Sequence, residues 1–476
     1  MKYTNTFLKF FFCYLGIGLT ACKKFVQIGP PNTRIVTASV FNNTSAATSA
    51  VLGIYTAMTQ DSYNMSLYGG ILSDELTNYS GDAGIISLYS NSMSSMATPG
   101  PWNNAYNYIY QANAVMGGLS KYGGGSAAVA QQLMGEAKFI RAYWYFYLTN
   151  CYGDVPLATS TDYTINSQLP RTARSDVYQQ IIKDLKDAET LLNSNFVDQS
   201  DTTIADDRIR PTKWAAAALL ARTYLYIGDY TNAVTKATEV INESSMFAIE
   251  PNLNKVFLAN SSEAIWQLAV PTPGFIASSN TLDGYAFILR TAPSNSGNTN
   301  ISTISNQLMS DFEPGDQRKI SWIGEFNTPD SPVVTFNFPY KYKVYQSNDI
   351  TEYTMMLRLA EQYLIRAEAG VQTNADPASI LRDINAIRHR AGLPDYTGGI
   401  DKQSLLDAVL HERRVEFFAE WGHRWFDLIR SNKANDVMSI VTPLKGGAWS
   451  PTGELFPIPQ SERLKDIHLT QNNGYN

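Results

Sequence analysis

The stretch from residue 212 to residue 241 constrains the fold of this chain most strongly. It reads TKWAAAALLARTYLYIGDYTNAVTKATEVI and places Leu225, Gly228, Tyr230 and Ala233 at the spacing L-x-x-G-x-Y-x-x-A. This spacing is the core of a tetratricopeptide repeat, in which the glycine ends the first helix and the small alanine lets the second helix pack closely. One helical hairpin cannot bury its apolar face alone, so the motif predicts further hairpins stacked against it.

Other segments also carry apolar residues at helical spacing. Residues 127–153 and 174–192 repeat an apolar residue every three or four positions, which predicts helices with one buried face. Residues 355–393 resemble a degenerate second copy of the hairpin. With 476 residues, 44% of them hydrophobic, the chain is long enough to bury a large core around such hairpins.

Residues 250–345 show little helical periodicity. They contain strand-like pieces such as EAIWQLAV and PVVTFNFPYKYKVY, separated by Pro, Gly, Ser and Asn. We therefore predict a mostly α fold, a tetratricopeptide-like helical-hairpin scaffold with an inserted loop-rich, partly β portion. The predicted scaffold covers about 35–245 and 351–430, the insertion covers about 250–350, and both belong to a single domain, 22–476.

The N-terminus has the pattern of a targeting segment. Two lysines precede the apolar run FFFCYLGIG, which is far shorter than the roughly 20 residues of a membrane-spanning helix. The next residues, Leu19-Thr20-Ala21-Cys22, form a bacterial lipobox, so we predict a lipoprotein signal peptide at 1–21 and lipidation of Cys22. Acyl chains on Cys22 would anchor the protein to a membrane without crossing it.

The remaining composition excludes several classes of protein. After cleavage only Cys151 would be left as a free cysteine, so no intramolecular disulfide is expected. The net charge of −6 gives no basic face for nucleic acid. There is no C-x-x-C, no G-x-S-x-G and no phosphate loop, and His411-Glu412 is followed by Val415 where a zinc-protease helix needs a second His. We predict no cofactor, although a glycosidase, which needs only two carboxylates, stays open.

The densest cluster of charged residues is HERRVEFFAEWGHRWFDLIR at 411–430. Glu412, Glu416 and Glu420 recur every four residues, which predicts one acidic ridge along a helix. Like charges at this spacing repel one another unless cations lie against them. The candidate cations are Arg366, Arg388, Arg390, Arg413 and Arg424. We predict a partly buried ion network between helices rather than a catalytic centre.

Five motifs in this order carry a family resemblance. They are GEAKFIRAYWYFYLTNCYGDVPL, RLAEQYLIRAEA, INAIRHRAGLP, HERRVEFFAEWGHRWFDLIR and ELFPIPQSERLKDIHLTQNNGY. Together with the lipobox they resemble the SusD/RagB family of Bacteroidetes nutrient-binding lipoproteins over nearly the whole chain. In the last motif, Lys465-Asp466 replaces the Asn-Pro that the family pattern has.

The resemblance implies a binding role without catalysis. Members of this family lie on the outer-membrane surface as lids over a SusC-like TonB-dependent transporter, to which they deliver captured oligosaccharide. The loop-rich insertion would then belong to the ligand-binding part of the chain. A peptide-binding, RagB-like role is the alternative, and an all-α glycoside hydrolase is a weaker one.

One segment has the chemistry of a surface that binds neutral glycans. From Ile35 to Ser120 there is no Lys, Arg or His, whereas the same stretch holds eight Tyr, nine Asn and Trp102. Sugars present apolar C–H faces to aromatic rings, and their hydroxyls need polar partners when they are buried. The other interpretation is a neutral packing segment, in which Trp102 anchors the helix that contains Tyr106 and Ile109.

The resemblance carries ligand binding over to Asp74, Trp102 and Asn107. A second wall of the site is expected from the irregular portion, where Tyr285 and Trp322 are candidates for exposed loop positions. The predicted ligand-binding residues are Asp74, Trp102, Asn107, Tyr285 and Trp322. No catalytic or metal-binding residue is predicted.

Overall fold

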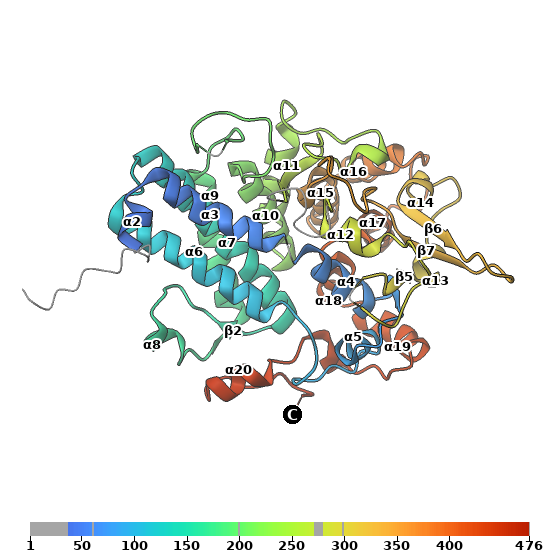
Figure 1. Cartoon of the computed structure of the whole chain (residues 1–476). Helices are drawn as coiled ribbons and strands as arrows, with labels where there is room; N and C mark the ends of the chain where they lie inside the picture. The colour runs from blue at the N-terminus through green and yellow to red at the C-terminus, as the bar shows by residue number, and fades with distance from the viewer. Residues whose placement is uncertain (1–36, 60, 199, 271–278, 298, 476) are drawn as a thin grey trace, which may run out of the picture.

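The computed structural model describes residues 37–475, apart from 60, 199, 271–278 and 298. The predicted signal peptide and Cys22 lie outside the described residues. Helices dominate the described chain, and the few strands are short, so the predicted fold class is confirmed (Figure 1).

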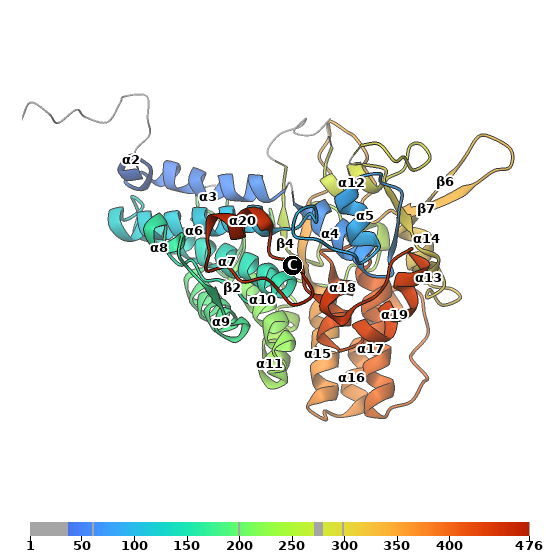
Figure 2. The same cartoon turned by 90° about the horizontal axis from the view of Figure 1, so that it is seen from below.

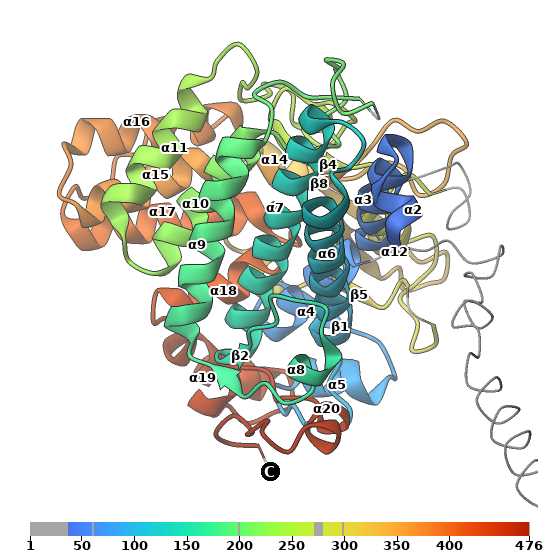
Figure 3. The ribbon, with the colours of Figure 1, turned by 90° about the vertical axis from the view of Figure 1, so that its left-hand side faces the viewer.

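Ten helices precede the loop-rich portion among the described residues. They are α2 (Thr37–Phe41), α3 (Thr44–Met58), α4 (Ser62–Leu72), α5 (Ala83–Tyr89), α6 (Trp102–Tyr122), α7 (Ala127–Tyr152), α8 (Tyr163–Asn166), α9 (Arg174–Leu191), α10 (Lys213–Tyr226) and α11 (Tyr230–Asn242). The long helices α6, α7, α9 and α10 follow one another as packed neighbours (Figure 3).

The hairpin α10–α11 forms at the predicted repeat motif. Gly228 follows the end of α10 with φ +76°, a left-handed conformation that glycine adopts without steric cost. Asp229 caps α11 by accepting a hydrogen bond from the backbone N–H of Asn232 at 3.3 Å. Ala233 is fully buried, as the close packing of the second helix requires.

The second helical part follows the loop-rich portion. Its elements are α15 (Leu359–Gln372), α16 (Pro377–Arg390), α17 (Lys402–Phe417), α18 (His423–Arg430), α19 (Ala434–Leu444), the 3-10 turn η2 (Pro451–Glu454) and α20 (Gln460–Lys465). Helices α15, α16 and α17 lie side by side (Figure 2). The two helical parts join where α15 packs against α10 and α11, and there Arg222 donates to both carboxylate oxygens of Glu361 at 2.7 and 2.6 Å.

The loop-rich portion holds short helices and most of the strands. Its elements are η1 (Leu253–Lys255), α12 (Leu282–Phe287), α13 (Asn306–Met309), α14 (Gln317–Ser321), β4 (Ala264–Leu268), β5 (Ser302–Ile304), β6 (Ile323–Asn327), β7 (Thr335–Pro339) and β8 (Thr354–Arg358). Strands β1 (Leu76–Asn78), β2 (Val155–Pro156) and β3 (Arg171–Thr172) lie earlier in the chain. The strands form four antiparallel pairs, β1–β5, β2–β3, β4–β8 and β6–β7. The β6–β7 hairpin projects from the body (Figures 1 and 2).

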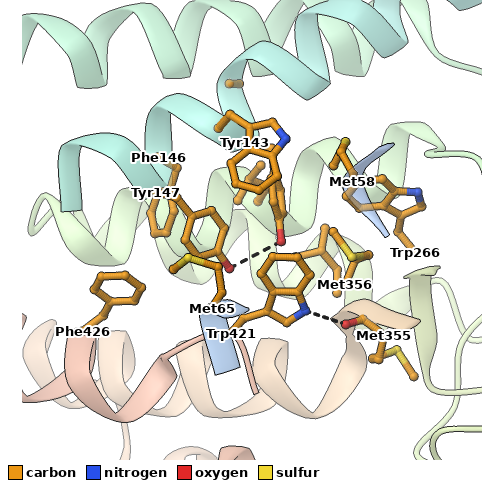
Figure 4. Packing of buried hydrophobic residues seen from close by; sticks show 14 of the residues in the cluster. Met58, Met65, Tyr143, Phe146, Tyr147, Trp266, Met355, Met356, Trp421 and Phe426 are labelled. Carbon is orange, nitrogen blue, oxygen red and sulfur yellow. Dashed lines mark hydrogen bonds between the residues drawn. The ribbon is translucent and has the colours of Figure 1, made fainter. Parts of the chain in front are cut away.

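An aromatic core joins the helices to the strand pair β4–β8. Tyr143 and Tyr147 of α7 meet Trp421, whose indole N–H donates to the backbone carbonyl of Met355 in β8 at 2.9 Å (Figure 4). Trp266 of β4 packs edge-on against Tyr143, with 5.5 Å between ring centroids. Because the indole N–H of Trp421 has a backbone partner, the large ring of Trp421 can be buried at little electrostatic cost.

The charged cluster at 411–430 forms the predicted ion network, with one correction. Glu412 and Glu416 lie on α17, but the helix ends at Phe417 and Glu420 follows in a turn. Ala419 and Trp421 have positive φ values of +50° and +47° in that turn. The prediction of a single helical ridge is therefore wrong for Glu420, although its carboxylate still reaches the network.

Cations from several elements surround these three carboxylates. Arg388 donates to Glu412 at 2.8 Å, as predicted, and Arg390 pairs with Glu416. Arg318, Lys341 and Arg358 from the loop-rich portion complete the network through the pairs Arg318–Glu412, Arg318–Glu416, Arg358–Glu416, Arg358–Glu420 and Lys341–Glu420. The other three candidate cations pair elsewhere, in the pairs Arg366–Asp383, Arg413–Asp427 and Arg424–Asp74.

Candidate functional site

Two hollows flank Trp102 at the start of α6. The first, the neutral hollow, has a volume of about 660 Å³. It is lined by Tyr68, Ser95, Met96, Thr98, Pro99, Gly100, Trp102, Asn103, Tyr152, Pro459, Gln460, Ser461 and Leu464, none of which carries a charge. Most of these residues come from the Ile35–Ser120 segment that the sequence marks as neutral, and the C-terminal segment with α20 supplies the opposite wall.

The floor of the neutral hollow is aromatic. The Trp102 ring lies edge-on to Tyr152, with 4.9 Å between centroids and an interplanar angle of 85°, and tilted against Tyr106. The side chain of Trp102 is only 4% exposed, so little of its ring is open to a ligand. Gly100 fits beside it because a Cβ there would lie 2.5 Å from the Tyr152 hydroxyl oxygen.

Polar side chains with no protein partner surround this floor. Within the described residues, the side chains of Tyr68, Asn103 and Gln460 form no hydrogen bond with the protein. Burial raises the pKa of Tyr68 to about 12, so its hydroxyl stays protonated at neutral pH. The backbone N–H of Gln460 donates to the carbonyl of Ser95 at 2.9 Å, which holds the two walls together. The hollow thus offers neutral donors and acceptors beside apolar surface.

The second, the apolar hollow, lies on the other side of Trp102 and α20. Its volume is about 330 Å³, and its lining is mostly apolar. The lining residues are Trp102, Tyr106, Ile109, Tyr110, Asn113, Pro156, Ala158, Ser160, Asn166, Ser167, Leu169, Glu462, Lys465, Asp466 and Leu469. Figures 1 and 3 show α8 and α20 on the same, lower side of α6.

Of the predicted ligand-binding residues, the structure brings only Trp102 to these hollows. Asn107 is exposed on α6 and lines neither hollow, whereas the neighbouring Asn103 lines the neutral one. Tyr285 is half-buried on α12 and stacks against Tyr345, with ring centroids 5.1 Å apart and an interplanar angle of 24°. Ligand binding by Tyr285 and Asn107 stays a prediction.

Asp74 is buried and its carboxylate is fully engaged by arginines. Arg424 donates to its two oxygens at 2.8 and 3.0 Å, and Arg414 lies at 2.9 Å. Burial opposes ionisation of Asp74, but the two arginines outweigh this effect and lower its pKa to about 2. Asp74 therefore ties the end of α4 to α17 and α18, and a ligand would have to displace an arginine to reach it.

Trp322 is fully buried, so its predicted position in an exposed loop is wrong. Its indole N–H donates to the backbone carbonyl of Leu253 at 2.9 Å. Lys341 and Arg390 lie 4.9 and 5.2 Å from its ring centroid. The ring packs against cations of the ion network, and the electron-rich face of an aromatic ring attracts such cations. It has no exposed surface for a ligand.

Glu313, His411 and Glu412 form the one cluster of potential metal ligands within the described residues. Arg388 already lies between the two carboxylates, at 2.5 Å from Glu313 and 2.8 Å from Glu412. Its guanidinium occupies the place where a cation would bind, so the cluster is explained as part of the ion network.

Sequence reasoning missed Tyr68, Asn103 and Gln460. Tyr68 and Asn103 belong to the neutral segment, and only their position relative to Trp102 distinguishes them from its other Tyr and Asn residues. Gln460 comes from the C-terminal segment, and no local signal links it to Ser95.

No helix in the described part of the chain is sufficiently long and apolar to cross a membrane.

Two family models match the chain. One, described as "Starch-binding associating with outer membrane", matches residues 32–225, and the other, described as "SusD family", matches residues 325–475. The chain belongs to the SusD/RagB family. Both matches lie where the sequence motifs and the two helical parts of the fold lie, so family membership and fold agree.

Named relatives support the same membership. SusD-like protein P25 of Formosa agariphila is 26% identical to this family member over 98% of each chain. Starch-binding protein SusD of Bacteroides thetaiotaomicron is 32% identical over 29% of this chain and 23% of its own. A solved structure described as a laminarin-binding SusD-like protein has a TM-score of 0.74 at 23% identity and covers 91% of this chain and 100% of its own. The last likeness concerns the fold alone.

Proposed function

We propose that this SusD-family member binds neutral oligosaccharide at the cell surface and delivers it to a SusC-like TonB-dependent transporter. The observation that carries the proposal is the neutral hollow beside Trp102. Its lining combines an aromatic floor with unpartnered amide and hydroxyl groups and contains no charged side chain. A buried sugar hydroxyl needs a polar partner, and the C–H faces of a sugar need apolar surface.

The names of two relatives support a carbohydrate as the ligand. One is named a starch-binding protein, and the other is described as laminarin-binding. The neutral hollow also argues against hydrolysis, because glycosidases need two carboxylates beside the bond that is cleaved and this lining has none. The proposed role is therefore capture and transfer without catalysis.

The site is tested by calorimetric titration of the full mature chain with neutral oligosaccharides selected on a glycan array. Asn103→Ala removes an exposed amide from the neutral hollow and should weaken binding about five- to tenfold, because one or two hydrogen bonds to the ligand are lost. Ser120→Ala, near the far end of α6, is the control and should bind like the wild type, because Ser120 is exposed and lines neither hollow. Equal affinities for all three proteins would exclude the neutral hollow as the binding site.

The anchor and the partner are tested separately. We propose that Cys22 carries lipid, that the protein faces the cell exterior, and that a β-barrel transporter is its partner. Metabolic labelling with a palmitate analogue should mark the wild type but not Cys22→Ala, and protease added to whole cells should reach the protein.

Purification from mild detergent should retain a β-barrel with the wild type. Absence of any co-purifying β-barrel would contradict the role as a transporter lid.

A further inference from the structure

The apolar hollow continues the neutral hollow across Trp102. Trp102 lines both, and α20 separates them, with Gln460, Ser461 and Leu464 on one side and Glu462 and Lys465 on the other. The rings of Tyr106 and Tyr152 both contact Trp102, so one aromatic floor extends beneath the two hollows. A ligand in the neutral hollow therefore lies next to the apolar one.

The side-chain polar groups on the floor of the apolar hollow already form hydrogen bonds within the protein. The Tyr106 hydroxyl donates to the carbonyl of Pro156 at 2.8 Å. The Asn113 amide donates to the carbonyl of Ala158 at 3.0 Å and accepts from Arg141 at 2.8 Å. These bonds leave the rings of Tyr106 and Tyr110 and the side chain of Leu169 as the surface that a ligand meets.

Several polar side chains at the rim of the apolar hollow also pair within the protein. Lys465 donates to Glu462 at 2.7 Å, and Asp466 accepts from the backbone N–H of His468 at 2.9 Å. The Asn166 amide donates to the carbonyl of Ser160 at 2.8 Å. A sugar hydroxyl buried on the floor would find the side-chain polar groups of Tyr106 and Asn113 already bonded, whereas an apolar group needs no such partner.

We propose that the oligosaccharide carries an apolar substituent, such as an aromatic or acyl ester group, and that the apolar hollow binds this substituent. The inference rests on the proposed function, because it assumes a glycan in the neutral hollow. The volume of about 330 Å³ lies within the range of small-molecule pockets, about 300–1,000 Å³, and suits one aromatic group. Tyr110, 53% exposed at the rim, extends the apolar surface toward solvent.

The test compares two glycosides of one neutral trisaccharide, the 4-nitrophenyl and the methyl glycoside, by calorimetry on the full mature chain. The wild type should bind the 4-nitrophenyl glycoside at least about tenfold more tightly, because a ring buries apolar area that a methyl group lacks. Tyr110→Ser should lose most of this preference and leave the affinity for the methyl glycoside unchanged. Tyr163→Ser is the control, because Tyr163 is exposed on α8 and lines neither hollow.

A second variant, Ala158→Asp, adds a carboxylate to the wall of the apolar hollow and should also abolish the preference. Thermal unfolding of each variant shows whether it folds like the wild type. If the wild type binds both glycosides equally and Asn103→Ala still weakens binding, this inference is overturned and the proposed function stands. The remaining occupant of the apolar hollow would then be an apolar segment of a partner protein. A preference that survives both Tyr110→Ser and Ala158→Asp would also overturn it. If neither glycoside binds, both this inference and the proposed function are overturned.

Discussion

Glu416 shows how a single residue at the centre of the ion network acts. Its carboxylate is fully buried and meets Arg318, Arg358 and Arg390. Burial opposes ionisation of Glu416, but these guanidinium groups outweigh it and hold its pKa well below the usual range. The residue is therefore charged at neutral pH, and it holds together elements far apart in the sequence.

Replacement of Glu416 by Gln should lower the free energy of unfolding by about 3–5 kcal/mol, because buried guanidinium charge is left uncompensated. Denaturant unfolding measures this loss. Asp407→Asn is the matched control, because Asp407 lies exposed on the same helix and its replacement should change stability little. Wild-type stability in Glu416→Gln together with lost ligand binding would reopen the functional interpretation of the 411–430 cluster.

Glu75 gives a prediction about pH. Burial raises its pKa to about 8 from the ordinary value of 4.5, and one of its oxygens has no hydrogen-bond partner within the described residues. Between these two pH values the folded chain keeps a proton that the unfolded chain releases. The stability contributed by protonated Glu75 is therefore lost as the pH rises from about 4.5 through 8.

Denaturant unfolding at several pH values between 5 and 8 tests this, with Glu75→Gln as the comparison. Asp283 and Glu352, whose pKa values burial raises to about 6 and 7, contribute in the same direction, so the difference between the two proteins is the relevant quantity. The variant should lose less stability than the wild type across this range. Parallel profiles would show that Glu75 does not titrate there.

At the scale of elements, the close approach of α4 to the start of α18 depends on Gly69. A Cβ on Gly69 would lie 2.2 Å from the Cα of Gly422, a backbone atom that cannot move aside. Gly69→Ala should therefore destabilise the protein by about 1–3 kcal/mol or more. Gly53→Ala is the control on α3, where nothing lies within 4 Å, and it should stabilise by up to about 1 kcal/mol. Thermal unfolding should shift in opposite directions, and equal shifts would contradict the packing.

Elements defined by local spacing could be predicted, whereas contacts between distant elements could not. The motif at Leu225 to Ala233 predicted the α10–α11 hairpin because the residues that shape this turn lie close together in the sequence. The helix of Glu412 and Glu416 was predicted to continue to Glu420, but it ends at Phe417. The turn that follows depends on positive φ values at Ala419 and Trp421, which residues of these types rarely adopt. Trp322 was assigned to an exposed loop, because only the fold brings it to the cations of the ion network.

For the whole molecule, composition indicated one wall of the proposed site and missed the other. The absence of cations between Ile35 and Ser120 predicted a neutral surface near Trp102, which the neutral hollow has. The second wall was expected from Tyr285 and Trp322 in the loop-rich portion. At the neutral hollow the opposite wall instead comes from Pro459, Gln460, Ser461 and Leu464, near the other end of the chain, and Gln460 bonds to Ser95 in the loop before α6.

The central claim is that this chain captures neutral oligosaccharide and does not cleave it. The most direct measurement is calorimetric titration of the full mature chain with a size series of neutral oligosaccharides, followed by chromatography of the recovered ligand. We expect saturable binding at one site, weakened by Asn103→Ala, and recovery of ligand with its length unchanged. Shortened products, or no binding of any neutral oligosaccharide while peptides bind, would contradict the account.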